Sequence, residues 1–191
     1  MTVAKHGVST DTPDRLLIDA GAVYTATDGN AGDPDVAGGG TLLGATRGGS
    51  VFEVNRTIRR MDPDGAKGPV KGFRRVEEVV ATLTVNLLEI TEENLLKALP
   101  GSPDLSGSTH IVKGAEIDDD DYIGSVAIVG TITGFDGTTK PIICRLLNVL
   151  VDGPFSVPMS PKDEAVVSMV FTAHFADSDL DTEPWEIEYP S

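Results

Sequence analysis

The sequence predicts a mainly β protein, built as an antiparallel β-sandwich or barrel with one short flanking α-helix. Three observations predict this fold class. Several stretches alternate between apolar and polar residues, 21 glycines and 12 prolines separate them, and only one segment has the pattern of a helix. With 191 residues the chain can bury one conventional core. We therefore expect a flexible N-terminal arm over residues 1–14, which are polar and aperiodic, and a single domain over residues 15–191.

Two long strands carry the clearest alternation. Residues 51–61 place Phe52, Val54 and Ile58 on one face and mostly polar side chains on the other. Residues 76–88 repeat this pattern over a similar length. At about 3.3 Å per residue each strand spans roughly 35 to 40 Å, which is long for a small sandwich. Both stretches predict half-buried strands of one hairpin.

The connection between these strands, residues 62–72, is longer than the usual two to five residues of a hairpin loop. Long connections inside compact domains are often functional. This one carries lysines and has arginine pairs on both sides, so we expect a cationic loop at the end of a long hairpin. The charged residues assigned to it are Arg59, Arg60, Asp64, Lys67, Lys71, Arg74 and Arg75.

The remaining elements follow from shorter patterns. Thr91 can cap a helix over residues 91–99, which Pro100 and Gly101 end. Trp185, Ile187 and Tyr189 alternate in the acidic tail and predict a terminal edge strand, although simple closure of the core remains open. Further strands are expected over residues 15–24, 109–116, 122–133, 139–151 and 164–176, with a loop over residues 25–40 and a hairpin turn at Asp136-Gly137.

Charge is unevenly distributed along the chain. Against 30 acidic residues the chain has 15 Lys and Arg, a net charge of −15. Residues 47–75 hold eight of these bases and only three of the acids, while residues 177–188 hold six acids and no base. This segregation favours head-to-tail contact between copies, with a solvated face as the open alternative. The candidate acidic counter-patch for the basic loop is Asp118, Asp119, Asp120 and Asp121.

The sequence offers little for catalysis or metal binding. His6, His110 and His174 show no metal-ligand spacing, and Cys144, as the one cysteine, has no intramolecular disulfide partner. The run Asp118-Asp119-Asp120-Asp121 lacks the glycine and glutamate positions of a calcium loop. We therefore expect no enzymatic activity, no cofactor and no metal. No apolar run approaches the length of a membrane span, so we expect no membrane contact.

Several stretches, taken in order, resemble the tail tube (major tail) proteins of long-tailed bacteriophages. They cover about a third of the chain, and the last is the weakest match. They are residues 43–49 (LGATRGG), 64–72 (DGAKGPVKG), 74–75 (RR), 81–89 (ATLTVNLLE) leading into 91–95 (TEENL), and 180–187 (LDTEPWEI). Residues 1–14 and 25–40 match nothing in that family.

The resemblance implies a structural virion protein that forms hexameric rings stacked into a tail tube, the conduit for DNA ejection. The inner strands, residues 51–61, 76–88, 122–133 and 139–151, would join across subunits into a β-barrel, and the basic loop would contact the next ring. Partners implied by the family are further copies of the chain and the tape-measure, tail terminator and baseplate proteins. The expected location is the virion tail, after assembly in the host cytoplasm.

One polar face is a candidate lumen surface, since small polar groups on a net acidic protein let DNA pass without binding it. Its residues are Asn55, Thr57, Thr82, Thr84 and Asn86. A soluble β-sandwich module that binds a ligand or a host surface is the alternative function.

Overall fold

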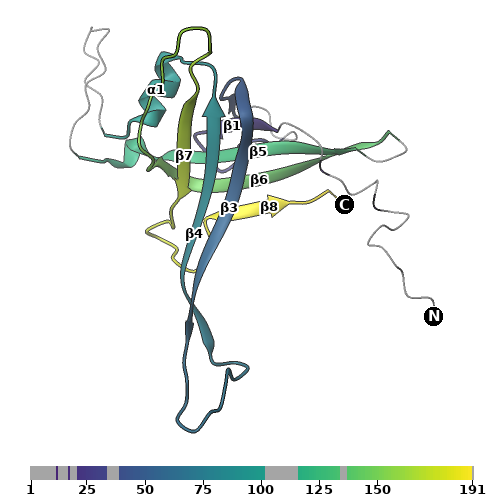
Figure 1. The fold of residues 1–191 in the computed structure, drawn as a ribbon, viewed down its shortest axis with the longest axis vertical. Helices are drawn as coiled ribbons and strands as arrows, with labels where there is room; N and C mark the ends of the chain where they lie inside the picture. The colour runs from purple at the N-terminus through teal and green to yellow at the C-terminus, as the bar shows by residue number, and fades with distance from the viewer. Residues whose placement is uncertain are drawn as a thin grey trace.

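A computed structural model describes residues 12, 17, 21–33, 39–101, 116–133 and 137–190. This part of the chain is mainly β, as the sequence predicts (Figure 1). The strands are β1 (Ala22–Ala26), β2 (Thr41–Leu42), β3 (Thr46–Arg60), β4 (Arg74–Leu87), β5 (Ile123–Thr133), β6 (Thr139–Val151), β7 (Val167–Ala173) and β8 (Trp185–Glu188). The helix α1 spans Glu92–Ala98, and one turn of 3₁₀ helix spans Asp119–Asp121.

The strands of the described residues form one antiparallel sheet in the order β2-β1-β5-β6-β7-β4-β3, with β8 added to β6. Strand β6 holds the sheet together because residues 143–146 pair with β8 and residues 149–151 pair with β7. The β3–β4 hairpin runs along the long axis of the molecule, and the β5–β6 hairpin crosses it (Figure 1). The sheet therefore folds over itself into two layers, and it stays open with β2 and β3 at its ends.

The main core lies between these two layers. On β4 every second residue from Ala81 to Leu87 is buried, which confirms the predicted alternation. These side chains meet Phe171 from β7 and Leu146 from β6, both fully buried. Helix α1 contributes Ala98 and closes one end of this core. Burial of these apolar side chains is the dominant stabilising term of the fold.

A smaller cluster covers the opposite face of the β5–β6 hairpin. Residues 27–33 form a loop over this face, and Ala31 packs there against Ala127 and Ile143. Ser125 Oγ accepts a hydrogen bond from Ala31 N at 3.1 Å, and it donates to the carbonyl oxygen of Asp28. The β5–β6 hairpin is therefore covered on both faces.

The helix forms where the sequence predicts it. Thr91 Oγ1 accepts a hydrogen bond from Asn94 N at 3.1 Å, which caps the first turn. The buried Asn94 side chain donates to the carbonyl oxygen of Leu43 at 2.8 Å and ties the helix to the segment between β2 and β3. The helix ends before Pro100, which cannot continue it.

Element bounds differ from the predictions in several places. Strand β3 begins at Thr46, five residues before the predicted start at residue 51. The pairing with β4 shifts register between Thr46 and Ser50, and Gly48 and Gly49 allow this shift because they adopt positive φ angles of 88° and 84°. Strand β7 is shorter than residues 164–176, whereas the predicted terminal edge strand is confirmed by β8. In the region predicted as a strand over residues 15–24, β1 begins at Ala22 and continues into the expected loop. Most of residues 1–14 and 109–116 lie outside the described residues.

Candidate assembly surfaces

The β3–β4 hairpin continues beyond the two-layered body and ends in the basic loop (Figure 1). Residues 56–60 of β3 and 74–78 of β4 are all exposed. We call these residues, together with the loop between them, the hairpin end. It is an exposed extension of the sheet, and at its base the Arg56 guanidinium lies 5.6 Å from the ring centroid of Trp185.

Arginines face each other across the hairpin end. The register pairs Arg59 with Arg75 and Arg60 with Arg74, and like charges directly opposite on adjacent strands are destabilising. Two acids relieve part of this repulsion, since Asp62 forms an ion pair with Arg60 and Glu77 lies 3.8 Å from Arg59. Positive charge is thus concentrated at the hairpin end, and the repulsion lowers the folding stability of the isolated chain.

A β-bulge sets which side chains share a face at the hairpin end. Thr57 pairs with Glu78 and Ile58 with Val76, which leaves Glu77 without a partner in the ladder. The bulge therefore places Val76 opposite Ile58, on the face that carries the core residues nearer the body. Ile58 is 52% exposed and Val76 55% exposed, so the apolar face continues past the core.

The tip of the hairpin is narrow. Its turn is held by Ala66 N donating to the carbonyl oxygen of Pro63 at 3.2 Å, and Met61 N donates to that of Phe73 at 3.0 Å. Gly65 lies in open space, with no atom within 4 Å of where a Cβ would stand. Lys67 and Lys71 are exposed, like Asp64, and neither lysine has an ion-pair partner among the described residues.

The polar residues predicted for a lumen surface do share one face. The register pairs Glu53 with Thr82, and two-residue steps along the strands place the candidate residues on the side away from the main core. Asn55 and Thr57 are exposed, while the three on β4 are half-buried. That face consists of Asn55, Thr57, Thr82, Thr84 and Asn86, with Val51, Glu53, Glu78 and Val80 between them.

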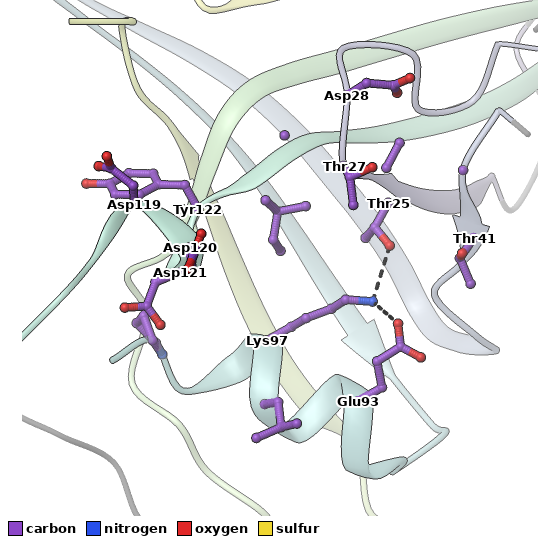
Figure 2. A pocket seen from close by; sticks show the side chains of 16 residues that line it. Thr25, Thr27, Asp28, Thr41, Glu93, Lys97, Asp119, Asp120, Asp121 and Tyr122 are labelled. Carbon is purple, nitrogen blue, oxygen red and sulfur yellow. Dashed lines mark hydrogen bonds and ion pairs between the residues drawn. The ribbon is translucent and has the colours of Figure 1, made fainter. Parts of the chain in front are cut away.

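A pocket of about 730 Å³ lies at the other end of the molecule from the basic loop, beside α1 (Figures 1 and 2). Lys97 extends into it from α1, with Nζ 2.7 Å from Glu93 Oε1 and 3.3 Å from Thr25 Oγ1. The hydrogen bond from Lys97, followed by its charge, lowers the pKa of Glu93. The lining comes from β1, β2, α1 and the start of β5, and includes Thr27, Asp28, Thr41, Pro100 and Tyr122.

Asp119, Asp120 and Asp121 of the acidic run form one wall of this pocket. Asp121 is engaged in holding the turn, since its carboxylate accepts hydrogen bonds from Asp118 N and Gly101 N, both at 2.9 Å. Asp119 and Asp120 are exposed. Of the four acids predicted as a counter-patch, these two remain for contact with another molecule.

The described residues show no group of three or more His, Cys, Asp and Glu side chains placed to hold a metal ion. His174 has a structural environment, because its ring stands edge-on to Tyr122 at 5.3 Å and Nδ1 lies 3.2 Å from the carbonyl oxygen of Asn148. Burial raises the pKa of the Cys144 thiol, which disfavours a reactive thiolate. No helix in the described ranges is long and apolar enough to cross a membrane.

Sequence reasoning missed Arg145, a buried residue on β6. Its Nε donates to the carbonyl oxygen of Ala31 at 2.8 Å, and its guanidinium forms an ion pair with Glu186 and lies 3.8 Å from Glu188. Arg145 thus fastens both β8 and the loop over residues 27–33 to the sheet. The signal was an arginine inside an apolar run, together with two acids spaced by two in the terminal strand.

No protein-family profile matches this sequence, and no curated protein matches it. Among solved structures, the crystal structure of an Hcp protein aligns at 11% identity and a TM-score of 0.34, covering 79% of this chain and 86% of the other. A double mutant of the Hcp1 protein from the E. coli EAEC 042 pathovar aligns at 12% identity and a TM-score of 0.38, covering 88% and 96%. Likeness at this level carries no functional argument, so the proposal below rests on the features of this chain.

Proposed function

We propose that this chain is a structural subunit without enzymatic activity, which assembles with copies of itself into hexameric rings that stack as a bacteriophage tail tube. The observation that carries the proposal is the hairpin end, an exposed and strongly cationic extension of the sheet. Retaining two opposed arginine pairs there costs the isolated chain stability. A negatively charged partner offsets that cost, and this chain itself has a net charge of −15.

Stacking follows from where the charges lie. The basic loop is at one end of the long axis and α1 is at the other (Figure 1). A contact between two different surfaces on successive copies does not close as a pair, so it continues along an axis. Complementary charge also guides such encounters and disfavours the wrong orientation.

Ring formation is supported by the open edge of the sheet. Strand β3 is 15 residues long and pairs only with β4 among the described strands. A long open edge is a template for pairing with another chain, and a closed barrel removes it. In our proposal a neighbouring subunit covers this edge. Strand β7 lies between β6 and β4, so the two long hairpins are not neighbours in the sheet.

The polar face of β3 and β4 then lines the channel. Asn55, Thr57, Thr82, Thr84 and Asn86 are uncharged, and the chain as a whole is acidic, so DNA passes without a binding site to hold it. The number of subunits, the virion tail as location, and the tape-measure, terminator and baseplate partners come from the sequence resemblance alone.

The pocket beside α1 favours a second candidate function, a soluble β-sandwich module that binds a ligand or a host surface. Its volume of about 730 Å³ is in the range of small-molecule sites. Such a module needs no self-assembly, so the state of the purified chain separates the two functions.

The test is to purify the full chain and follow it by sedimentation velocity and negative-stain electron microscopy over a range of concentration and ionic strength. We expect rings and tubes.

The double variant Lys67→Glu/Lys71→Glu is expected to lose tubes while keeping the circular dichroism spectrum and Tm of the parent chain. As a matched control, the single variant Lys162→Glu makes the same change of net charge as Lys67→Glu at another exposed position and is expected to keep tubes. A chain that stays monomeric under every condition contradicts the proposed function.

A further inference from the structure

We infer that the pocket beside α1 is the socket into which the basic loop of a second copy of this chain docks. The inference rests on the proposed function, because it assigns the receiving surface of the head-to-tail contact. We call the residues lining the pocket the socket.

Position in the molecule requires the occupant to be another copy. The basic loop and α1 lie at opposite ends of the long axis, so a loop cannot reach the socket of its own chain (Figure 1). Each copy presents one loop and one socket, and each added copy presents another of each. The contact therefore repeats without limit along one direction.

In the socket the positive charge of Lys97 has partners, whereas two of the negative charges do not. The amine of Lys97 is already engaged by Glu93 and Thr25 (Figure 2). Asp119 and Asp120 are exposed, and neither has an ion-pair partner among the described residues. The socket thus keeps net negative charge, and Lys67 and Lys71 of the loop are likewise unpaired in the part of the chain that the structure describes.

Apolar surface provides a second, independent match. Tyr122 lines the socket, and Ile117, directly before the acidic run, is 53% exposed. At the hairpin end, Ile58 and Val76 are exposed as an apolar pair. Exposed apolar groups rimmed by charge mark protein interaction sites more than solvated faces. Both surfaces therefore combine charged and apolar groups, with opposite charge.

Shape agrees with this assignment. The tip of the basic loop contains Gly65, Ala66 and Gly68, so its backbone can enter a pocket without a bulky side chain in the way. The socket is formed by α1, β1 and the turn before β5, three elements held to the main body. A narrow loop thus meets a receiving surface that is already formed.

Charge reversal in both surfaces tests the inference. Asp119→Lys/Asp120→Lys is expected to lower the amount of pelletable tube by at least about tenfold, as the loop reversal Lys67→Glu/Lys71→Glu does. Combining all four substitutions is expected to restore tubes. The matched control combines the loop reversal with Asp177→Lys/Asp181→Lys, two exposed acids of the C-terminal region, and is expected not to restore them.

Three results overturn the socket while leaving the tube intact as a function: tubes from Asp119→Lys/Asp120→Lys at the parent level, no recovery in the fourfold variant, or equal recovery in the control. A parent chain that forms neither rings nor tubes instead contradicts the proposed function itself.

Disulfide cross-linking between copies provides a second test, because a folding defect does not produce a ladder of covalent oligomers. In a Cys144→Ser background, Lys67→Cys/Asp120→Cys is expected to give a ladder of covalent oligomers on oxidation, because each copy links to the next. Lys67→Cys/Asp181→Cys is expected to give no ladder. A ladder from the control pair alone contradicts the assigned socket.

Discussion

The two long hairpins of this molecule have strands of 15 and 14 residues and of 11 and 13 residues, but different surroundings. The β5–β6 hairpin packs with one face on the main core and carries the loop over residues 27–33 on the other. The β3–β4 hairpin packs with one face over only part of its length, and beyond residue 56 it is exposed. The β5–β6 hairpin is therefore buried within its own chain, whereas the end of the β3–β4 hairpin is accessible to further copies.

Arginine shows the difference most clearly. Arg145 on β6 is buried, and it is neutralised by Glu186 and Glu188. At the hairpin end, Arg59 and Arg60 of β3 stand opposite arginines of β4 and only partly meet acids of their own chain. The buried charge on the β5–β6 hairpin is satisfied locally, whereas charge at the hairpin end is left for an intermolecular contact.

The largest expected difference lies within one strand, and it can be measured on the dissociated chain. Leu83→Ala, at a fully buried position of β4, should lower the free energy of unfolding by about 3 to 5 kcal/mol. Val76→Ala, on the same strand but 55% exposed, should change it by less than about 0.5 kcal/mol. Urea denaturation followed by circular dichroism measures both. Similar losses would show that the hairpin end is packed within one chain.

Arg145→Met should lower the free energy of unfolding by about 2 to 4 kcal/mol, because it leaves the Ala31 carbonyl and two carboxylates without their partner. Both carboxylates are more than half exposed, which keeps the loss toward the lower end. Fluorescence of Trp185, the single tryptophan, should report loosening of β8. The control Arg47→Met removes the exposed ion pairs with Asp163 and Glu164 and should cost less than about 1 kcal/mol. Equal losses of unfolding free energy in the two variants would mean that Arg145 does not fasten β8 and the loop over residues 27–33.

Ser125→Ala tests the cover on the second face of β5–β6. It removes the hydrogen bonds to Ala31 N and to the carbonyl of Asp28, so we expect a loss of about 1 to 2 kcal/mol in the free energy of unfolding. Ser168→Ala on β7, at an exposed position, is the matched control and should be close to neutral. An unchanged Tm for Ser125→Ala would mean that the loop is not fastened there.

The smallest effect has the opposite sign. Arg75→Thr removes one of the opposed arginine pairs, so it should stabilise the dissociated chain by about 0.2 to 1 kcal/mol at low salt. The gain should shrink at 1 M salt, where charge repulsion is screened. Thermal unfolding at two salt concentrations measures it. A destabilised variant at low salt would mean that the pair is not repulsive in the folded chain.

Local pattern predicted most strands and the helix, because side-chain alternation and a capping threonine act over a few residues. The order of the strands depends on contacts far apart in sequence, so the insertion of β7 between β6 and β4 had no local signal. The bulge at Glu77 could not be predicted for a similar reason, since a residue is recognised as unpaired only when the register with its partner strand is known.

The candidate surfaces were predictable in part. The charges of the basic loop and the acidic run are visible in the sequence, but their placement at opposite ends of the molecule is a property of the fold (Figure 1). Sequence also gave no means to separate Asp121, which is engaged in its own turn, from Asp119 and Asp120, which are not. Arg145 was overlooked because its partners come from two segments that are far from it in sequence, the loop over residues 27–33 and β8.

The bulge at Glu77 makes the outer part of the hairpin independent of the inner part. Side chains along a strand alternate with a period of two, so one unpaired residue reverses the facing of everything beyond it on that strand. A regular ladder of the same residues would pair Glu77 with Ile58, move Val76 to the polar face and exchange the sides on which Arg74 and Arg75 stand, while the buried residues from Ala81 to Leu87 keep their places. One unpaired residue therefore decides which side chains the hairpin end presents on each face, without changing the core of the chain.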